Sequence, residues 1–182
     1  MKLNKVAVAM AFTAVLSTGS VLAADPAPAP ATTNGSIELQ GELVNTACGL
    51  APNSSPVSVD FGQVPVSALK DGKIKDVQKN IELQDCDTTV AKSAVVSYTP
   101  TSTNPNDTTL AAFTSGTASG AGIGLKDSAS QDVKWGQKTT PVTLVNGTNK
   151  IPFVAFLKAD NDTNTVTAGT FQSTINFQID YQ

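Results

Sequence analysis

The chain has 182 residues, about one domain by size, with twelve lysines, no arginine, no histidine and fifteen acidic residues, a formal net charge of −3. Without histidine, Ser-His-Asp and Cys-His nucleophilic sites and histidine-ligated metals are excluded. An acidic chain without arginine has no bidentate phosphate clamp and no basic face for nucleic acid. We therefore expect no enzymatic activity, no cofactor and no nucleic-acid partner.

The composition also indicates where the protein functions. Hydrophobic residues make up 40% of the chain, enough for a packed core, whereas charged residues make up only 15%. Globular proteins typically contain about 25% charged residues. Thr, Ser, Asn, Gln and Gly must therefore cover most of the surface, a composition typical of exported β-proteins.

The N-terminus predicts a secretory signal peptide over residues 1–23. Lys2 and Lys5 precede an apolar run at residues 6–16, and Val21 and Ala23 place small side chains at the −3 and −1 positions of a cleavage site. The run is too short to span a membrane, and no later segment reaches 18 apolar residues. We therefore expect an exported protein without a transmembrane segment.

Cys48 and Cys86 are the two cysteines of the chain, and both follow the signal peptide. In an oxidising compartment such an isolated pair favours a disulfide. The alternatives are a metal pair or a reactive thiol, but two cysteines without histidine complete a tetrahedral zinc site only if carboxylates contribute. We predict the disulfide.

Beyond the signal peptide, Pro26, Pro28 and Pro30 predict an extended arm with no core of its own. Alternating apolar and polar residues predict strands at residues 37–43, 57–61, 80–84, 94–98, 122–125, 142–145 and 151–157. Turn-forming clusters lie between them at residues 53–56, 104–107, 146–147 and 160–164. A helical turn fits only within residues 66–79, so the pattern predicts an all-β sandwich or barrel.

The last segment of the chain, residues 169–181, has the strongest alternation. Every even position is polar, and the odd positions are mostly apolar: Gly169, Phe171, Ser173, Ile175, Phe177, Ile179 and Tyr181. A continuous strand of this length would extend about 40 Å. Such a pattern predicts a half-buried strand with one face on the core.

An N-terminal segment of similar reach, residues 33–43, carries Ile37, Leu39, Gly41 and Leu43 on one side. From the pattern alone, this strand belongs either to the core of its own sandwich or, on its proline arm, to a neighbouring molecule through β-strand addition. The two readings stay open at this point.

Five segments, in order along the chain, carry a family resemblance. They are residues 37–48 leading into Cys48, residues 59–64, residues 81–87 around Cys86, a predicted hairpin at residues 146–153, and a terminal segment with Gly169 fourteenth and Tyr181 second from the end. Each is weak by itself, but together they resemble chaperone–usher pilins of the type 1 fimbrial major-subunit family. The resemblance covers essentially the whole sequence.

The resemblance implies an incomplete immunoglobulin-like β-sandwich, the six-stranded pilin fold, over residues 44–182. Residues 24–43 would form an N-terminal extension, a flexible arm plus a donor strand that completes the fold of another subunit. The donor residues would be Ile37, Leu39, Gly41 and Leu43. The acceptor groove, which a chaperone also recognises, would be formed by Gly169, Phe171, Ile175, Phe177, Ile179 and Tyr181.

The resemblance also implies partners and a location. A periplasmic chaperone lends a strand first and delivers the subunit to an outer-membrane usher, where the donor strand of the next subunit replaces it. The product is a homopolymeric fimbria on the cell surface that supports adhesion. A minor adaptor pilin and a small secreted sugar-binding adhesin of sandwich fold are the alternative functions. The acidic pairs Asp85/Asp87 and Asp160/Asp162 have the ordinary pattern of turn residues.

Overall fold

The computed structural model describes residues 33–41, 43, 45–161 and 165–182. The chain divides into two units, residues 1–42 and residues 43–182. The predicted signal peptide and proline arm lie outside the described residues. Residues 33–41 have no regular secondary structure, and the side chains of Ile37 and Leu39 are 86% and 89% exposed.

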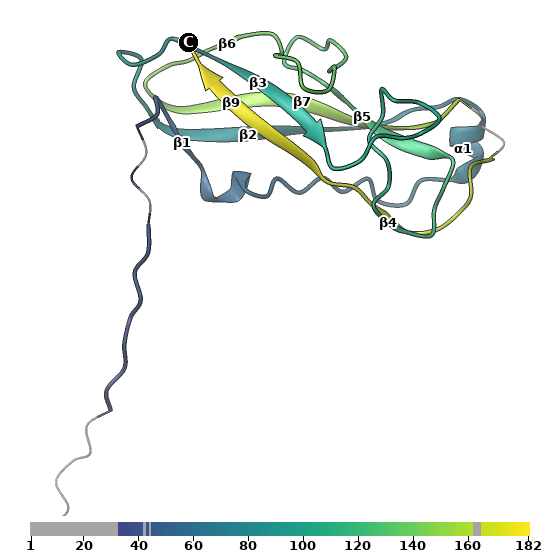
Figure 1. Ribbon diagram of the computed structural model, residues 1–182, viewed down its shortest axis with the longest axis horizontal. Helices are drawn as coiled ribbons and strands as arrows, with labels where there is room; N and C mark the ends of the chain where they lie inside the picture. Colours follow the sequence, from purple (N-terminus) through teal and green to yellow (C-terminus); the bar gives the residue numbers. More distant parts are fainter. Residues whose placement is uncertain (1–32, 42, 44, 162–164) are drawn as a thin grey trace, which may run out of the picture. The chain divides into compact units, whose positions relative to one another are not determined.

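The second unit is built almost entirely of strands (Figure 1). In chain order the elements are β1 (Gly49–Leu50), the 3-10 turn η1 (Pro52–Ser54), α1 (Val66–Lys70), β2 (Lys75–Cys86), β3 (Ser93–Pro100), β4 (Ser115–Gly116), β5 (Ala121–Lys126), β6 (Val142–Thr143), β7 (Gly147–Ala159), β8 (Phe171–Gln172) and β9 (Ile175–Tyr181). All pairings between them are antiparallel.

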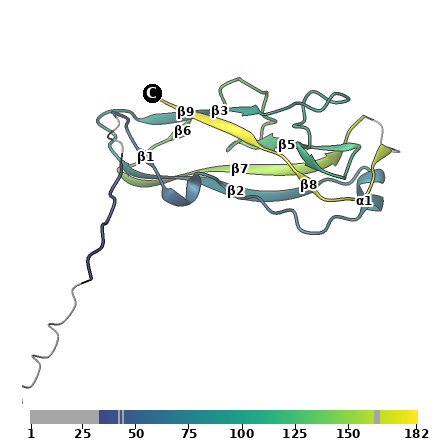
Figure 2. The same cartoon turned by 60° about the horizontal axis from the view of Figure 1, so that its bottom comes forward.

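Two sheets enclose the core (Figure 2). The first has the order β1-β2-β7-β5, the second the order β6-β3-β9, and β4 and β8 form a short separate pair. Their apolar faces contribute fully buried residues, among them Ile81, Leu83 and Leu157 from the first sheet and Val96 from the second. Burial of such side chains from water is the main stabilising contribution to a sandwich of this kind.

Several sequence predictions are confirmed by these elements. The predicted strands at residues 80–84, 94–98, 122–125 and 151–157 lie within β2, β3, β5 and β7, and the helical turn is α1. β2 and β7 are longer than the alternating patterns predicted. Their ends are exposed or half-buried and carry polar side chains on both faces, so the alternation stops before the strand does.

Three predictions are wrong in detail. Residues 57–61 alternate as predicted, but no described residue pairs with them, so they form no strand. Residues 146–153 do not form the predicted hairpin: residues 147–153 already belong to β7 of the first sheet, whereas the preceding strand β6 belongs to the second. The terminal segment is not one continuous strand: it is interrupted at Ser173 and Thr174, where it changes partner from β4 to β3.

Cys48 and Cys86 form a disulfide, with their Cα atoms 4.1 Å apart and a sequence separation of 38. It ties the chain entering the domain to the end of β2. Replacing both cysteines by serine is expected to lower the free energy of unfolding by about 4 kcal/mol, because the cross-link restricts the unfolded chain. Chemical denaturation with and without the bond measures this loss. Labelling of the unreduced protein by a thiol reagent would contradict the bond.

Candidate functional site

The candidate site begins with an unpaired sheet edge. On the first sheet, the outer edge of β5 is covered, since Ala111 and Ile123 exchange backbone hydrogen bonds of 2.7 and 3.0 Å and the Val133 amide donates to the Leu125 carbonyl. β9 pairs with β3 along one edge, and within the described residues no strand lies along its other edge. Such an edge is a ready template for another strand.

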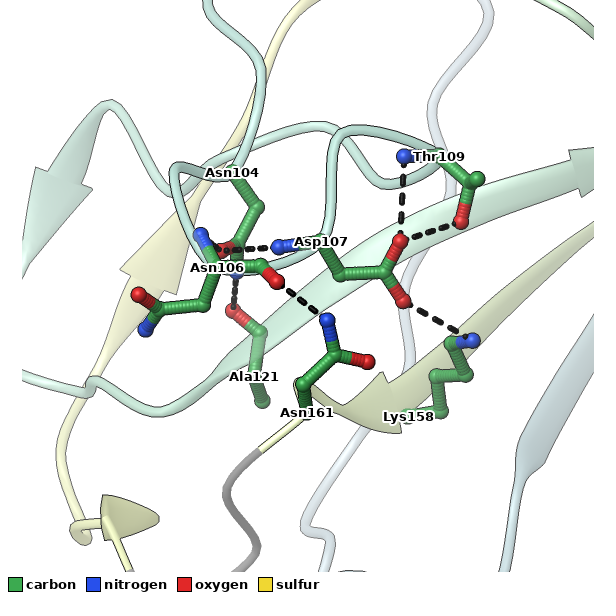
Figure 3. Close-up of polar contacts among 7 residues, drawn as sticks. All are labelled: Asn104, Asn106, Asp107, Thr109, Ala121, Lys158 and Asn161. Atoms are coloured by element: carbon green, nitrogen blue, oxygen red, sulfur yellow. Dashed lines mark hydrogen bonds and ion pairs between the residues drawn. The ribbon is translucent and has the colours of Figure 1, made fainter.

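A polar network holds the loop that covers β5 (Figure 3). The side chain of Asn104 donates to the Ala121 carbonyl at 3.2 Å, and the Asn161 amide group donates to the carbonyl of Asn106. Asp107 accepts from Thr109 and lies 3.1 Å from the Lys158 ammonium group, and these interactions hold the pKa of Asp107 below its usual value. With β5 covered in this way, β9 provides an open edge on the second sheet.

An apolar groove of about 720 Å³ lies beside this edge. One wall is the unpaired segment with Val57 and Val59, the other wall includes Ile175 and Phe177 of β9, and the floor includes Phe153 of β7. Among the described residues that line it, none has a charged side chain. The groove is therefore a place where apolar side chains lose contact with water while a backbone pairs with β9.

A second cavity of about 490 Å³ continues the groove toward α1, with Val66, Leu69 and Gly169 in its lining. Phe61 and Phe171 lie between the two cavities and line both, with ring centroids 6.1 Å apart. Phe171 also stacks on Phe113 at 4.6 Å. The groove thus consists of two mainly apolar pockets separated by an aromatic pair, and Asp60 also lines the second pocket.

The structure places the predicted acceptor residues as follows. Phe171, Ile175 and Phe177 line the main groove, and Gly169 lines only the second cavity. Phe171, Ser173, Ile175, Phe177, Ile179 and Tyr181 are all half-buried, whereas the alternate positions are exposed, except that Asp180 is half-buried. An apolar face that is only half-buried is what a sandwich lacking one strand leaves behind.

Two of these residues have additional structural roles. A Cβ atom on Gly169 would collide with the side chain of Thr117 and the backbone of Ala118, so only glycine fits this close approach. The Tyr181 hydroxyl donates to the Cys48 carbonyl at 3.4 Å, which joins the end of β9 to the disulfide. Neither role could be read from the alternation.

The titratable groups near the site serve the scaffold. Burial raises the pKa of Tyr98 and of Tyr181. Burial also disfavours the charged form of Asp127, but hydrogen bonds from Thr140, Gln131 and Ala129 outweigh it and lower the pKa of that carboxyl. In the described part of the chain no group of three or more His, Cys, Asp or Glu residues is arranged to hold a metal.

Sequence reasoning missed part of the groove. Leu69, Phe113 and Val166 line the second cavity, yet each lies in a short helix or a loop where no alternation points inward. Val57 and Val59 did show a signal, because their alternation marks a buried face; the interpretation as a paired strand was wrong. No helix among the described residues is long and apolar enough to cross a membrane.

Comparison with known proteins was decisive for the family. The model of the family described as "Fimbrial protein" matches residues 37–182, which include residues 37–43 of the N-terminal segment and the whole sandwich. The chain belongs to the fimbrial protein family. This fimbrial protein is 55% identical to the "Major fimbrial subunit" of Proteus mirabilis (strain HI4320) over the full length of both chains, and 34% identical to the "Fimbria A protein" of Serratia marcescens, again over both full lengths.

Solved structures agree with that assignment. A chain from a chaperone–usher pilus, whose structure addresses rod uncoiling, is 26% identical with a TM-score of 0.72, covering 86% of this chain and 100% of that one. The P pilus rod subunit PapA is 24% identical with a TM-score of 0.64, covering 75% of this fimbrial protein and 100% of PapA. The fold is therefore the incomplete immunoglobulin-like sandwich of chaperone–usher pilins.

Proposed function

We propose that this fimbrial protein is a structural subunit of a fimbria and polymerises by donor-strand exchange. The observation that carries the proposal is the pairing of two incomplete surfaces in one chain. The domain has an apolar groove along an unpaired edge of β9, and the N-terminal segment carries Ile37 and Leu39 almost fully exposed. Insertion of that segment into the groove of another copy completes both surfaces.

The energetics favour insertion. Burial of Ile37, Leu39 and Leu43 would contribute about 1.5–3 kcal/mol each, or roughly 5–9 kcal/mol together before the cost of ordering the segment. Backbone hydrogen bonds to β9 add to this and set the register. Gly41 would permit close approach where a side chain does not fit.

The direction of the inserted strand follows from the opposite directions of the two groove walls and from the end at which each chain leaves the groove. Residues 57–64 lead from η1 toward α1, whereas β9 runs the opposite way and ends beside Cys48. An inserted strand is therefore antiparallel to only one wall. If it runs antiparallel to β9, its C-terminal end leaves the groove near α1, away from the end where the recipient's own N-terminal segment departs. If the inserted strand ran parallel to β9, its C-terminal end would leave the groove beside Cys48. It would then collide with the recipient's own N-terminal segment, which departs from the same end.

Such a contact is heterologous, since one surface of each copy binds a different surface of the next, and it therefore grows into a filament. Before assembly the same groove and edge are an aggregation hazard. A periplasmic chaperone that lends a strand, followed by transfer at an outer-membrane usher, would protect them on the way to the cell surface. The likeness to a major fimbrial subunit supports a main structural subunit over a minor adaptor pilin or a sugar-binding adhesin.

The test is surface assembly without the donor segment. Cells producing the full chain together with its secretion partners are expected to carry filaments visible by electron microscopy, and cells producing a chain without residues 24–43 are expected to carry none. Export of the shortened subunit to the periplasm is the control. Filaments of normal length from the shortened chain would contradict the proposal.

A further inference from the structure

The two ends of the domain carry exposed residues that neither the groove nor the core uses. At the end where the chain enters from the N-terminal segment, Val90 and Val145 are 61% and 59% exposed, and Asp85 and Asp87 are exposed beside them. We call these four residues the exit surface. At the other end of β2, Lys70, Lys73, Ile74 and Lys75 form what we call the helix surface, with Ile74 53% exposed.

The exit surface is rigid. Asn146, next to Val145, accepts hydrogen bonds from the amide and hydroxyl of Thr88 at 2.8 and 2.7 Å, which join its two loops. The Asp87 amide donates to the Ala47 carbonyl at 2.8 Å, and buried Asn149 exchanges hydrogen bonds with Val145 at 2.9 and 2.6 Å. Exposed valines held in this way are suited to a fixed partner, because little conformational entropy is lost on docking.

The helix surface is similarly ordered. The amides of Asp71, Gly72 and Lys73 donate to carbonyls of α1 at 2.9 Å each, closing the turn that presents Ile74. Gly72 has a φ of +74°, which glycine adopts without strain. Val66 and Leu69 of α1 line the second cavity, so the helix surface borders the end of the acceptor groove.

We propose that the exit surface of one subunit docks on the helix surface of the next, as a second interface between copies of this chain beside the donor strand. The proposal rests on the proposed function, because insertion antiparallel to β9 brings the C-terminal end of the donor to α1. From Leu43 to Ala47 the chain reaches at most about 14 Å. The two ends of β2 lie about 36 Å apart, so only one end of the recipient is within that reach.

The charges of the two surfaces are complementary. The exit surface has two aspartates, with the exposed Lys92 nearby, and is net negative. The helix surface has three lysines, with exposed Asp71 and Asp76 beside them, and is net positive. Opposite potentials favour this docking and disfavour contact between two copies of the same surface. Three observations identify the partner of the helix surface as another copy of this chain. They are the short connection between the donor strand and its own domain, the opposite charges of the two surfaces, and the position of the helix surface at the end of the acceptor groove.

The experiment compares assembled fibres of the wild type, Val90→Glu and Ile74→Glu. Each substituted side chain is more than half exposed, so monomer folding should be unchanged. Thr99→Glu, an exposed position on β3, introduces the same charge away from both surfaces and is the matched control. We expect fibres of both end variants to dissociate in guanidinium about tenfold faster than wild-type and Thr99→Glu fibres. They should also bend over a wider range of angles in electron micrographs.

Two control measurements separate this inference from the proposed function. Monomeric variants are tested for thermal unfolding and for binding of a peptide covering residues 31–45, which samples only the groove. Peptide binding equal to the wild type, combined with weaker fibres, supports the second interface. Equal peptide binding with wild-type dissociation and bending overturns it. If the wild-type protein does not bind the peptide at all, that result refutes donor-strand exchange instead.

Discussion

A synthetic peptide covering residues 31–45 is expected to raise the melting temperature of the domain comprising residues 44–182 by about 10 °C when present at a hundredfold excess over its dissociation constant. Ligand binding at that excess contributes about 2.7 kcal/mol to the folded state, and a domain of this size gains a few degrees per kcal/mol. The peptide fills the 720 Å³ groove and pairs with β9, both of which are otherwise open. Thermal unfolding by circular dichroism provides the measurement.

A peptide with Leu39→Asp is the matched control for this effect. Insertion would place a carboxylate in the 720 Å³ pocket, whose lining among the described residues has no charged side chain, so it must be protonated or left unpaired. We expect it to lose most of the stabilisation. The truncated domain with bound wild-type peptide should also fail to extend a fibre, since it has no strand to pass on. Coincident melting curves with either peptide and with none would refute the donor role of Ile37, Leu39, Gly41 and Leu43.

Phe177→Asp is expected to prevent accumulation of the subunit in the periplasm. Phe177 pairs with Tyr98 in the register of β9 and β3, and its half-buried side chain lines the groove. An aspartate there costs several kcal/mol, either through burial of a charge or through its protonation. The variant should be degraded and should not co-purify with the proposed periplasmic chaperone.

The control for this prediction is Gln178→Asp, which places the same carboxylate on the solvent side of β9 one residue later. That variant should accumulate normally and enter fibres. Immunoblots of periplasmic extracts and chaperone pull-downs distinguish the two. Normal secretion and assembly of the Phe177→Asp subunit would contradict the groove and its proposed roles in chaperone recognition and strand acceptance.

Some features of this protein follow from the sequence by itself. Alternation with a period of two determines which face of each strand is apolar, so it predicts strands at residues 80–84, 94–98 and 151–157 without any tertiary contact. The same alternation over residues 171–181 correctly assigned Phe171, Ile175 and Phe177 to the inward face. The isolated pair Cys48 and Cys86 indicates the disulfide because the predicted signal peptide directs the chain to an oxidising compartment, a reason that does not depend on geometry.

Other features depend on which segments become neighbours, and local patterns carry no such information. Residues 57–61 have the alternation of a paired strand, yet they form an unpaired wall of the groove, because no strand of the described residues lies beside them. The change of partner at Ser173 and Thr174 depends on where β3 ends and β4 begins. Strand pairing arises from contacts between residues far apart in sequence, so only the tertiary structure decided that the inward face of β9 borders an open groove.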